Sequence, residues 1–180
     1  MKNTALMMLM LLTSFAYGQS GRIGMKGTNE IGLNYNSWHR IYEDGIDAAP
    51  GYTELAVGYG RWVSDYMVVG GNLSYTRNGA IAETWNFSAS SKYYFISNKR
   101  LGLYAKADGG VLYQERTRDL AGEKSTYVTP YLSVGGGAEY RITPKWVVFG
   151  EASYLRMFSD NVISPKRNFM TWTLGSKLRF

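Results

Sequence analysis

The sequence predicts an all-β protein, an eight-stranded antiparallel transmembrane β-barrel with short turns at one end and longer loops at the other. Three observations predict it. Large apolar residues alternate with small or polar ones through most of the chain, which is typical of strands with two different faces. Most alternating segments reach the roughly nine to eleven residues that a tilted strand needs to cross hydrocarbon. The connections alternate between short and long, as in membrane barrels.

The composition of this 180-residue chain excludes several classes of protein. It contains no Cys and one His, which argues against disulfide frameworks, thiol nucleophiles and most Cys or His metal sites. The net charge of +6 comes from dispersed Lys and Arg residues, without the basic run of a nucleic-acid-binding arm. We therefore expect no metal, no cofactor and no nucleic-acid partner.

Residues 1–18 have the order of a secretory signal peptide. Lys2 supplies the positive start, residues 5–12 form an apolar run too short to span a bilayer, and Ala16 and Gly18 are the small residues that a signal peptidase reads. The alternative is a buried N-terminal helix. We expect cleavage near Gln19, which leaves residues 19–180 as one barrel domain. No later stretch is long and apolar enough to predict a transmembrane helix.

Each element is predicted from its alternation and its flanking turn residues. The predicted strands are 29–36, 52–62, 66–76, 81–95, 101–113, 127–141, 146–156 and 168–180. The predicted short turns are 63–65, 96–100 and 142–145, and the predicted long loops are 37–51, 114–125 and 157–167, with 77–80 as a short connection on the loop side. Pro130 cannot donate a ladder hydrogen bond, so it predicts a bulge or a position above the membrane. Gly135 to Gly137 lie within a strand, where small residues favour bending or lumen packing.

One face of each predicted strand carries large apolar side chains, and the other carries small or polar ones. In the last strand, Met170, Trp172, Leu174, Leu178 and Phe180 oppose Thr171, Thr173, Gly175, Lys177 and Arg179. A soluble lipocalin-like barrel would place the large apolar face inside. A narrow lumen suits the small polar face better, and aromatic residues gather near both ends of the strands, as in interfacial girdles. The predicted girdle residues are Trp62, Tyr66, Phe95, Tyr140, Trp146 and Phe180 beside the turns, and Tyr35, Tyr75, Tyr113 and Tyr127 near the loops.

The inward face carries five charges of each sign. They are Glu30, Glu54, Lys92, Lys106, Asp108, Glu139, Arg141, Glu151, Lys177 and Arg179. Unpaired charges in a narrow lumen are costly, so we expect a network of salt bridges with Glu54, Lys92, Lys106, Asp108, Glu139 and Glu151 near its centre. Two interpretations remain open. The network is either a static polar plug or a gate in a small-solute pore.

The last residues, Trp172-Thr173-Leu174-Gly175-Ser176-Lys177-Leu178-Arg179-Phe180, alternate and end in an aromatic residue. This segment resembles the C-terminal assembly signal of Gram-negative outer-membrane barrels, with Trp172, Leu174, Leu178 and Phe180 as its apolar positions. With the signal peptide and eight strands, the chain resembles the small outer-membrane β-barrel superfamily that includes OmpA, OmpX and OmpW. The resemblance implies an outer-membrane monomer with periplasmic termini and turns, extracellular loops, and contact with the barrel-assembly machinery during biogenesis.

The functional hypotheses belong to different classes. We favour a non-enzymatic barrel with an envelope-structural or surface-contact role, and the alternative is a narrow channel for ions or small hydrophobic solutes. Basic residues near the loops could contact lipopolysaccharide phosphates, although surface cations are ordinary; they are Arg40, Arg77, Arg116, Arg118, Lys166 and Arg167.

The third hypothesis is a lipid A-modifying enzyme. It depends on His39, which lies near Ser37, Glu43 and Asp44. Ser37 precedes His39, the reverse of the His-x-Ser order in lipid A deacylases. A Ser, a His and an acid within one loop are weak evidence without geometry. We therefore expect no catalytic residues.

Overall fold

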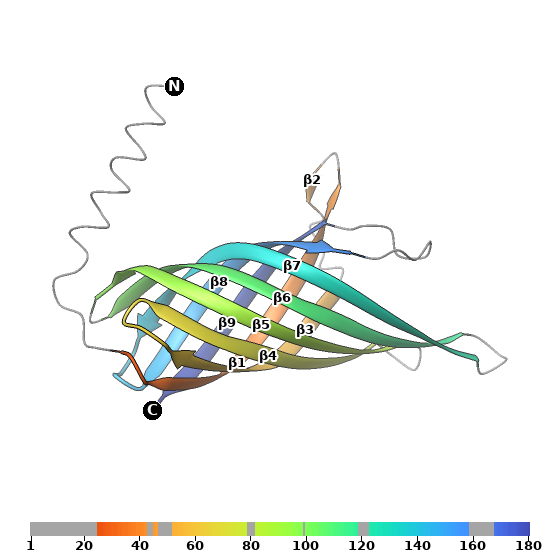
Figure 1. Ribbon diagram of the computed structural model, residues 1–180. Helices are drawn as coiled ribbons and strands as arrows, with labels where there is room; N and C mark the ends of the chain where they lie inside the picture. Colours follow the sequence, from red (N-terminus) through yellow and green to blue (C-terminus); the bar gives the residue numbers. More distant parts are fainter. Residues whose placement is uncertain are drawn as a thin grey trace, which may run out of the picture.

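The alternating segments form one closed antiparallel barrel. In the computed structural model, β1 (Asn29–Tyr42), β3 (Tyr52–Trp62), β4 (Met67–Asn78), β5 (Ala82–Ser97), β6 (Leu101–Arg118), β7 (Glu123–Arg141), β8 (Trp146–Met157) and β9 (Asn168–Arg179) pair in chain order, as Figure 1 shows. β1 also pairs with β9, from Glu30 with Arg179 to Arg40 with Phe169, and this pairing closes the sheet. A two-residue strand, β2 (Gly45–Ile46), pairs only with the end of β1.

The structure describes residues 25–42, 45–46, 52–78, 82–98, 100–118, 123–158 and 168–180. Residues 1–24, which include the predicted signal peptide, lie outside this part of the chain. Among the described residues, no helix has the length and hydropathy needed to cross a bilayer. The predicted fold class, an eight-stranded antiparallel barrel, is confirmed.

The two ends of the barrel have different connections. At the end that we call the turn end, β1 starts and β9 stops, and the amide of Asn29 donates to the carbonyl of Phe180. Side chains stabilise the connections here, since Asn98 Oδ1 accepts from the amides of Arg100 and Leu101 and Thr143 Oγ1 accepts from the amide of Trp146. The opposite end is called the loop end below.

Two predicted long loops are wrong, because strands occupy much of them. β1 continues to Tyr42, and β6 and β7 remain paired up to Arg118 with Glu123. The added segments of β6 and β7 are polar at successive positions in the sequence, so the alternation that marks a strand is lost while backbone pairing continues. The third predicted loop, 157–167, lies largely outside the described residues. The β6 and β7 hairpin therefore extends as a two-stranded ribbon at the loop end (Figure 1).

Pro130 does not form a bulge. It pairs in register with Val111, and the register shift between β5 and β6 lies elsewhere, between Tyr94 and Ile96. The carbonyl of Pro130 accepts from the amide of Phe158, the residue after the end of β8. A residue's N–H and C=O face the same neighbour in an antiparallel sheet. The N–H that proline lacks would therefore point toward β8, at the position where the pairing of β7 with β8 ends.

The predicted faces are observed, with corrections among the girdle residues at Trp62 and at Tyr127, which has the inward parity of Thr129 and Tyr131. Apolar side chains such as Leu33, Leu55 and Leu174 are exposed on the outside. Tyr140, Trp146 and Phe180 are exposed near the turn end, and Tyr35 and Tyr75 are exposed near the loop end. Trp62 is instead 0% exposed and points inward. Trp62 lies an even number of residues from the inward-pointing Glu54 and Ala56 on β3, so the strand alternation places it inside. Its nearness to a turn, on which the girdle prediction relied, does not decide which way it points.

Glycines in β7 leave room for large side chains in the lumen. A Cβ on Gly137 would lie 2.5 Å from the carbonyl oxygen of Gly150 and 2.8 Å from the Tyr104 hydroxyl. Both distances are shorter than van der Waals contact, and one involves backbone, which cannot move away easily. Gly137 therefore permits the ring of Tyr104 to cross the lumen.

We predict that Gly137→Ala lowers the free energy of unfolding by about 1 to 3 kcal/mol through overpacking. Gly150→Ala is the matched control, since the nearest atom to its Cβ would be 3.4 Å away, on the side chain of Leu174. The measurement is urea unfolding of the refolded barrel in lipid vesicles. Equal stabilities of the two variants would contradict the role given to Gly137.

Candidate functional site

The lumen collects the charged side chains that the sequence placed on the inward face. β1, β3, β5, β6, β7, β8 and β9 each supply at least one of them, because every second residue of a barrel strand points inward. Glu30, Glu54, Glu139, Arg141, Glu151, Lys177 and Arg179 are buried, and the side chains of Lys92, Lys106 and Asp108 are 13%, 12% and 9% exposed. The lumen is therefore the candidate site, and nine of its ten charges form two ion-paired clusters.

The turn-end cluster is built around Glu139, which is 1% exposed. Arg179 Nη2 donates to both carboxylate oxygens of Glu139, at 2.7 and 2.8 Å, and Lys177 Nζ lies 3.0 Å from Oε2. The same two cations reach Glu30 on β1, with Lys177 at 2.8 Å and Arg179 Nε at 3.2 Å. Arg141 completes the cluster at 3.4 Å from Glu139 Oε1. Two carboxylates thus hold three cations from β7 and β9.

Aromatic side chains fill the space around this cluster and bond to it. The Tyr94 hydroxyl donates to Glu139 Oε2 at 2.9 Å, and Trp62 Nε1 donates to Glu30 Oε2 at 3.2 Å. The rings of Trp62 and Tyr94 lie 4.7 Å apart, and the Arg179 guanidinium lies 5.2 Å from the Trp62 ring. Such cation–π contacts favour a desolvated guanidinium. The charges and rings together occupy the lumen at the turn end.

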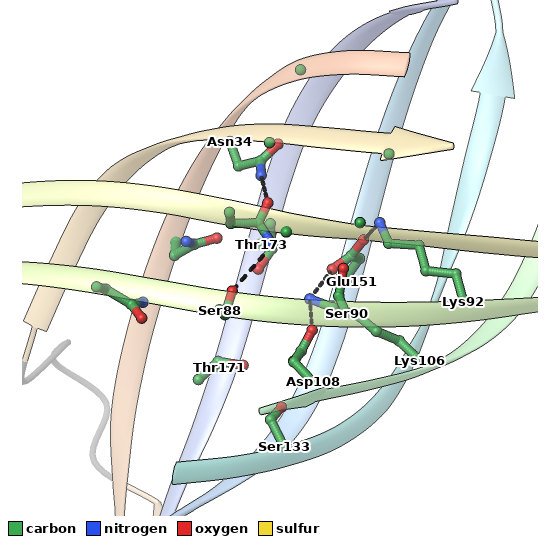
Figure 2. A pocket seen from close by; sticks show the side chains of 18 of the residues that line it. Asn34, Ser88, Ser90, Lys92, Lys106, Asp108, Ser133, Glu151, Thr171 and Thr173 are labelled. Carbon is green, nitrogen blue, oxygen red and sulfur yellow. Dashed lines mark hydrogen bonds and ion pairs between the residues drawn. The ribbon is translucent and has the colours of Figure 1, made fainter. Parts of the chain in front are cut away.

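The second cluster, in the middle of the lumen, is centred on Glu151 of β8. Its carboxylate pairs with Lys92 of β5, and Lys106 Nζ of β6 lies 2.8 Å from Glu151 Oε2 and 3.0 Å from Asp108 Oδ1 (Figure 2). The Tyr104 hydroxyl donates to Glu151 Oε1 at 2.8 Å. Two lysines therefore face two carboxylates.

Glu54 lies apart from both clusters and is held by neutral groups. Its carboxylate accepts from Asn36 Nδ2 at 2.8 Å, from Ser74 Oγ at 2.5 Å and from Asn86 Nδ2 at 3.2 Å. The expectation that Glu54 lies near the centre of the salt bridges is therefore wrong, since it makes no ion pair with a described residue. Amide and hydroxyl donors from β1, β4 and β5 hydrogen-bond to its carboxylate instead. Two charges in the same lumen do not form an ion pair when they lie at different positions along the barrel axis.

An apolar cluster that the sequence analysis missed lies in the lumen at the loop end. Its members are Trp38, Leu112, Tyr131, Leu155, Met157 and Phe169. The Trp38 ring meets those of Tyr131 and Phe169 edge to face, with centroids 6.0 Å apart in both cases. The alternation of the strand could have located this cluster. Every second residue of β1 points inward, and Trp38 continues the series of Asn34 and Asn36 beyond the predicted end of the strand.

The segment before β1 folds over the turn end. The amides of Met25 and Lys26 both donate to Asp65 Oδ1, at 2.8 and 3.1 Å, and the amide of Gly27 donates to the carbonyl of Trp62. Gly27 has a φ of 89°, a conformation that glycine adopts without strain. Met25 is thereby buried against Trp62, Val68, Tyr94 and Tyr104. Apolar side chains are thus buried at both ends of the lumen.

The surface candidates are only partly described. Arg40 lies in β1 opposite Phe169 and is half-buried. The backbones of Arg77, Arg116 and Arg118 are paired within β4 and β6, while Lys166 and Arg167 lie outside the described residues. The assembly-signal side chains Trp172, Leu174, Leu178 and Phe180 are 50% to 66% exposed on the outer face.

His39 lies beside Ser37 on β1, with His39 Nε2 2.8 Å from Ser37 Oγ. Both have the outward parity of Leu33 and Tyr35, and both are half-buried. Glu43 and Asp44, the nearby acids, lie outside the described residues. Over the described ranges, no group of three or more His, Asp or Glu side chains is placed to hold a metal.

We predict that Glu139→Gln lowers the free energy of unfolding by about 3 to 5 kcal/mol, because it leaves Lys177 and Arg179 with too little buried negative charge. Glu54→Gln is the control and should cost less, since neutral donors surround Glu54. Urea unfolding in lipid vesicles measures both. A larger loss in Glu54→Gln would show that ion pairing in the turn-end cluster is not the main interior stabilisation.

Comparison with known proteins gives the same architecture. No curated protein matches the chain. Among solved structures, neisserial surface protein A has a TM-score of 0.61 at 15% identity, covering 86% of this chain and 98% of that one. Ail, the attachment invasion locus protein of Yersinia pestis, solved with the heparin analogue sucrose octasulfate, has a TM-score of 0.60 at 19% identity, covering 87% and 100%. Outer membrane protein H of Pseudomonas aeruginosa has a TM-score of 0.61 at 14% identity, and the match covers 84% of this chain and 99% of that one.

These identities are low, so the likenesses to solved structures show the fold alone. The family comparison goes further. The sequence signature described as "Outer membrane protein beta-barrel domain" matches residues 4–180, which is nearly the whole chain. The chain therefore belongs to the outer membrane protein β-barrel domain family and is a small β-barrel protein of the Gram-negative outer membrane.

Proposed function

We propose that this protein is a non-enzymatic, non-conducting barrel that acts through the surface it presents at the loop end. The observation that carries the proposal is that buried side chains fill much of the lumen. Trp62 at the turn end is 0% exposed, Trp38 at the loop end is 3% exposed, and ion-paired side chains occupy the space between the turn end and the middle of the barrel. An eight-stranded interior is just wide enough for side chains to fill, so these layers leave little room for a continuous water path.

The projecting hairpin supports a role in surface contact. β6 has 18 residues and β7 has 19, whereas β3 has 11 and β8 has 12. Because roughly nine to eleven residues suffice to cross the hydrocarbon, part of the hairpin extends beyond it. In the sequence, residues 115–124 of this hairpin include both acidic and basic residues, a composition that suits contact with a charged surface. The structure of Ail with a heparin analogue is one precedent for this fold and a sulfated ligand.

The first test is solute and ion flux through the protein refolded into liposomes, after a gel shift between boiled and unboiled samples has shown that the barrel formed. We expect flux equal to that of empty liposomes. Lys106→Gln and Glu151→Gln should lower stability without creating flux, because Trp38 and Trp62 still close the ends. Flux in the wild-type protein that changes in either variant would instead support a channel gated by the lumen charges.

A shortened hairpin tests the contact role. Arg116 and Ser125 are direct partners in the sheet, so an Asn-Gly turn can join them in place of residues 117–124. We expect the shortened protein to keep its gel shift and to lose adhesion of the displaying bacteria to cells or to sulfated matrix. Unchanged adhesion would contradict a contact role for the hairpin.

The contact between His39 and Ser37 is the one observation that favours an enzyme. Backbone amides near it are used in the ladders of β1 with β3 and β9, so they are poorly placed to stabilise an oxyanion. We expect His39→Ala to leave the mass spectrum of lipid A from expressing cells unchanged. Loss of a lipid A modification in that variant would replace the proposal with a lipid-modifying enzyme.

A further inference from the structure

A cavity of about 80 Å³ lies in the lumen, bordered by the middle charge cluster and by the loop-end aromatic cluster. Hydroxyl and amide groups form part of its walls (Figure 2); they come from Asn34, Asn72, Ser88, Ser90, Ser133, Thr171 and Thr173. Trp38, Tyr131, Phe149 and Leu155 supply apolar wall. A guest that fits these walls needs both hydrogen-bonding groups and a hydrocarbon surface.

Several polar groups facing the cavity have unused hydrogen-bonding capacity. Asp108 has a side chain only 9% exposed, and its Oδ1 is ion-paired with Lys106 Nζ at 3.0 Å. A carboxylate accepts several hydrogen bonds, so this one partner leaves acceptor capacity on Asp108. Ser90 and Ser133 are its direct partners on the two flanking strands. Directly paired side chains are neighbours, about 5 Å apart at Cβ. The Ser90 and Ser133 hydroxyls make no hydrogen bond with a described residue.

The charges at the cavity favour a neutral guest. Lys92 and Lys106 are ion-paired with Glu151 and Asp108, and Lys177 with Glu30, and all six line it. Glu54 also lines it, with its carboxylate hydrogen-bonded to Asn36, Ser74 and Asn86, so no charge at the cavity lacks partners. A charged guest would add an uncompensated charge in a site of low dielectric, which is costly. The remaining acceptor capacity of the Asp108 carboxylate calls for donors, so the guest must donate hydrogen bonds. O–H groups on a neutral molecule meet both conditions.

We propose that this cavity binds one small neutral polyol of about three carbon atoms. Its hydroxyls donate to Asp108 and bond with Ser90 and Ser133, and its C–H surface packs against the rings of Trp38 and Tyr131. An apolar cavity of about 150 Å³ in another protein holds a benzene ring, so the smaller volume here limits the guest to a short carbon skeleton. Water alone would satisfy the polar wall but leave the aromatic wall without a matching surface.

The site does not depend on the proposed surface role. The buried ion pairs and Trp62 block the turn end, so the guest enters from the loop end, where side chains of the aromatic cluster around Trp38 must move to admit it, and it does not cross the barrel. A polyol can therefore bind whether or not the loop end contacts another surface. Flux and adhesion measurements test the proposed function, whereas binding in the lumen tests this site.

The test uses glycerol as the probe and the full barrel in lipid nanodiscs, followed by amide chemical shifts. We expect saturable shifts at Ser90, Asp108 and Ser133, and Ser90→Ala should weaken glycerol binding several-fold by removing one hydroxyl partner. Ser91→Ala is the matched control, because Ser91 follows Ser90 in β5 and points outward on the same face as Ala89 and Tyr93. Propan-1-ol, with the same carbon chain and one hydroxyl, should bind more weakly than glycerol.

Three results would overturn the site. One is a set of shifts that rise linearly with glycerol without saturating. Another is an equal effect of Ser90→Ala and Ser91→Ala, with both variants shown to be folded by the gel shift. The third is a cavity that holds only water, seen as amide-to-water cross-peaks at Ser90 that glycerol does not displace.

Discussion

The ion pairs between Glu30 and the cations of β9 constrain the whole barrel, because they cross the seam where the first strand meets the last. Glu30 and Arg179 are direct partners in that seam, and Lys177 reaches Glu30 from two residues away on the same strand. A slip of one residue would turn Glu30 toward the hydrocarbon and leave Lys177 and Arg179 short of negative charge. The buried pairs therefore fix the register that also closes the backbone ladder.

The same network explains why the lumen is filled rather than open. Lysine and arginine side chains that reach across the barrel need space along their stems, and rings of Trp62, Tyr94 and Phe149 pack against them. Glycines opposite these rings provide the volume, as Gly175 does for Phe149 and Gly137 for Tyr104. Charge neutralisation and close packing are thus achieved by the same side chains, which favours a rigid interior over a conducting one.

The position of each group along the barrel axis divides the lumen into layers of different chemistry. Cations and carboxylates concentrate from the turn end to the middle, neutral amides and hydroxyls surround Glu54, and the aromatic cluster around Trp38 covers the loop end. The proposed contact surface and the proposed ligand site are the parts that this packing does not use. These are the hairpin that extends past the barrel and the polar cavity beside Asp108.

The sequence by itself determined the fold class, the strand order and the face on which each charge lies, because a period of two and a hydrocarbon solvent leave few alternatives. It also indicated why Gly135 to Gly137 belong in a strand. It could not determine strand ends beyond the bilayer, where β6 and β7 continue through segments that are polar at successive positions. The inward position of Trp62 follows from the alternation of β3, whereas its place next to a turn predicted the outside. Only the tertiary structure decided which charges meet, since the stagger of neighbouring strands sets the height of each residue. That stagger separates Glu54 from the lysines and brings Glu139 to Arg179.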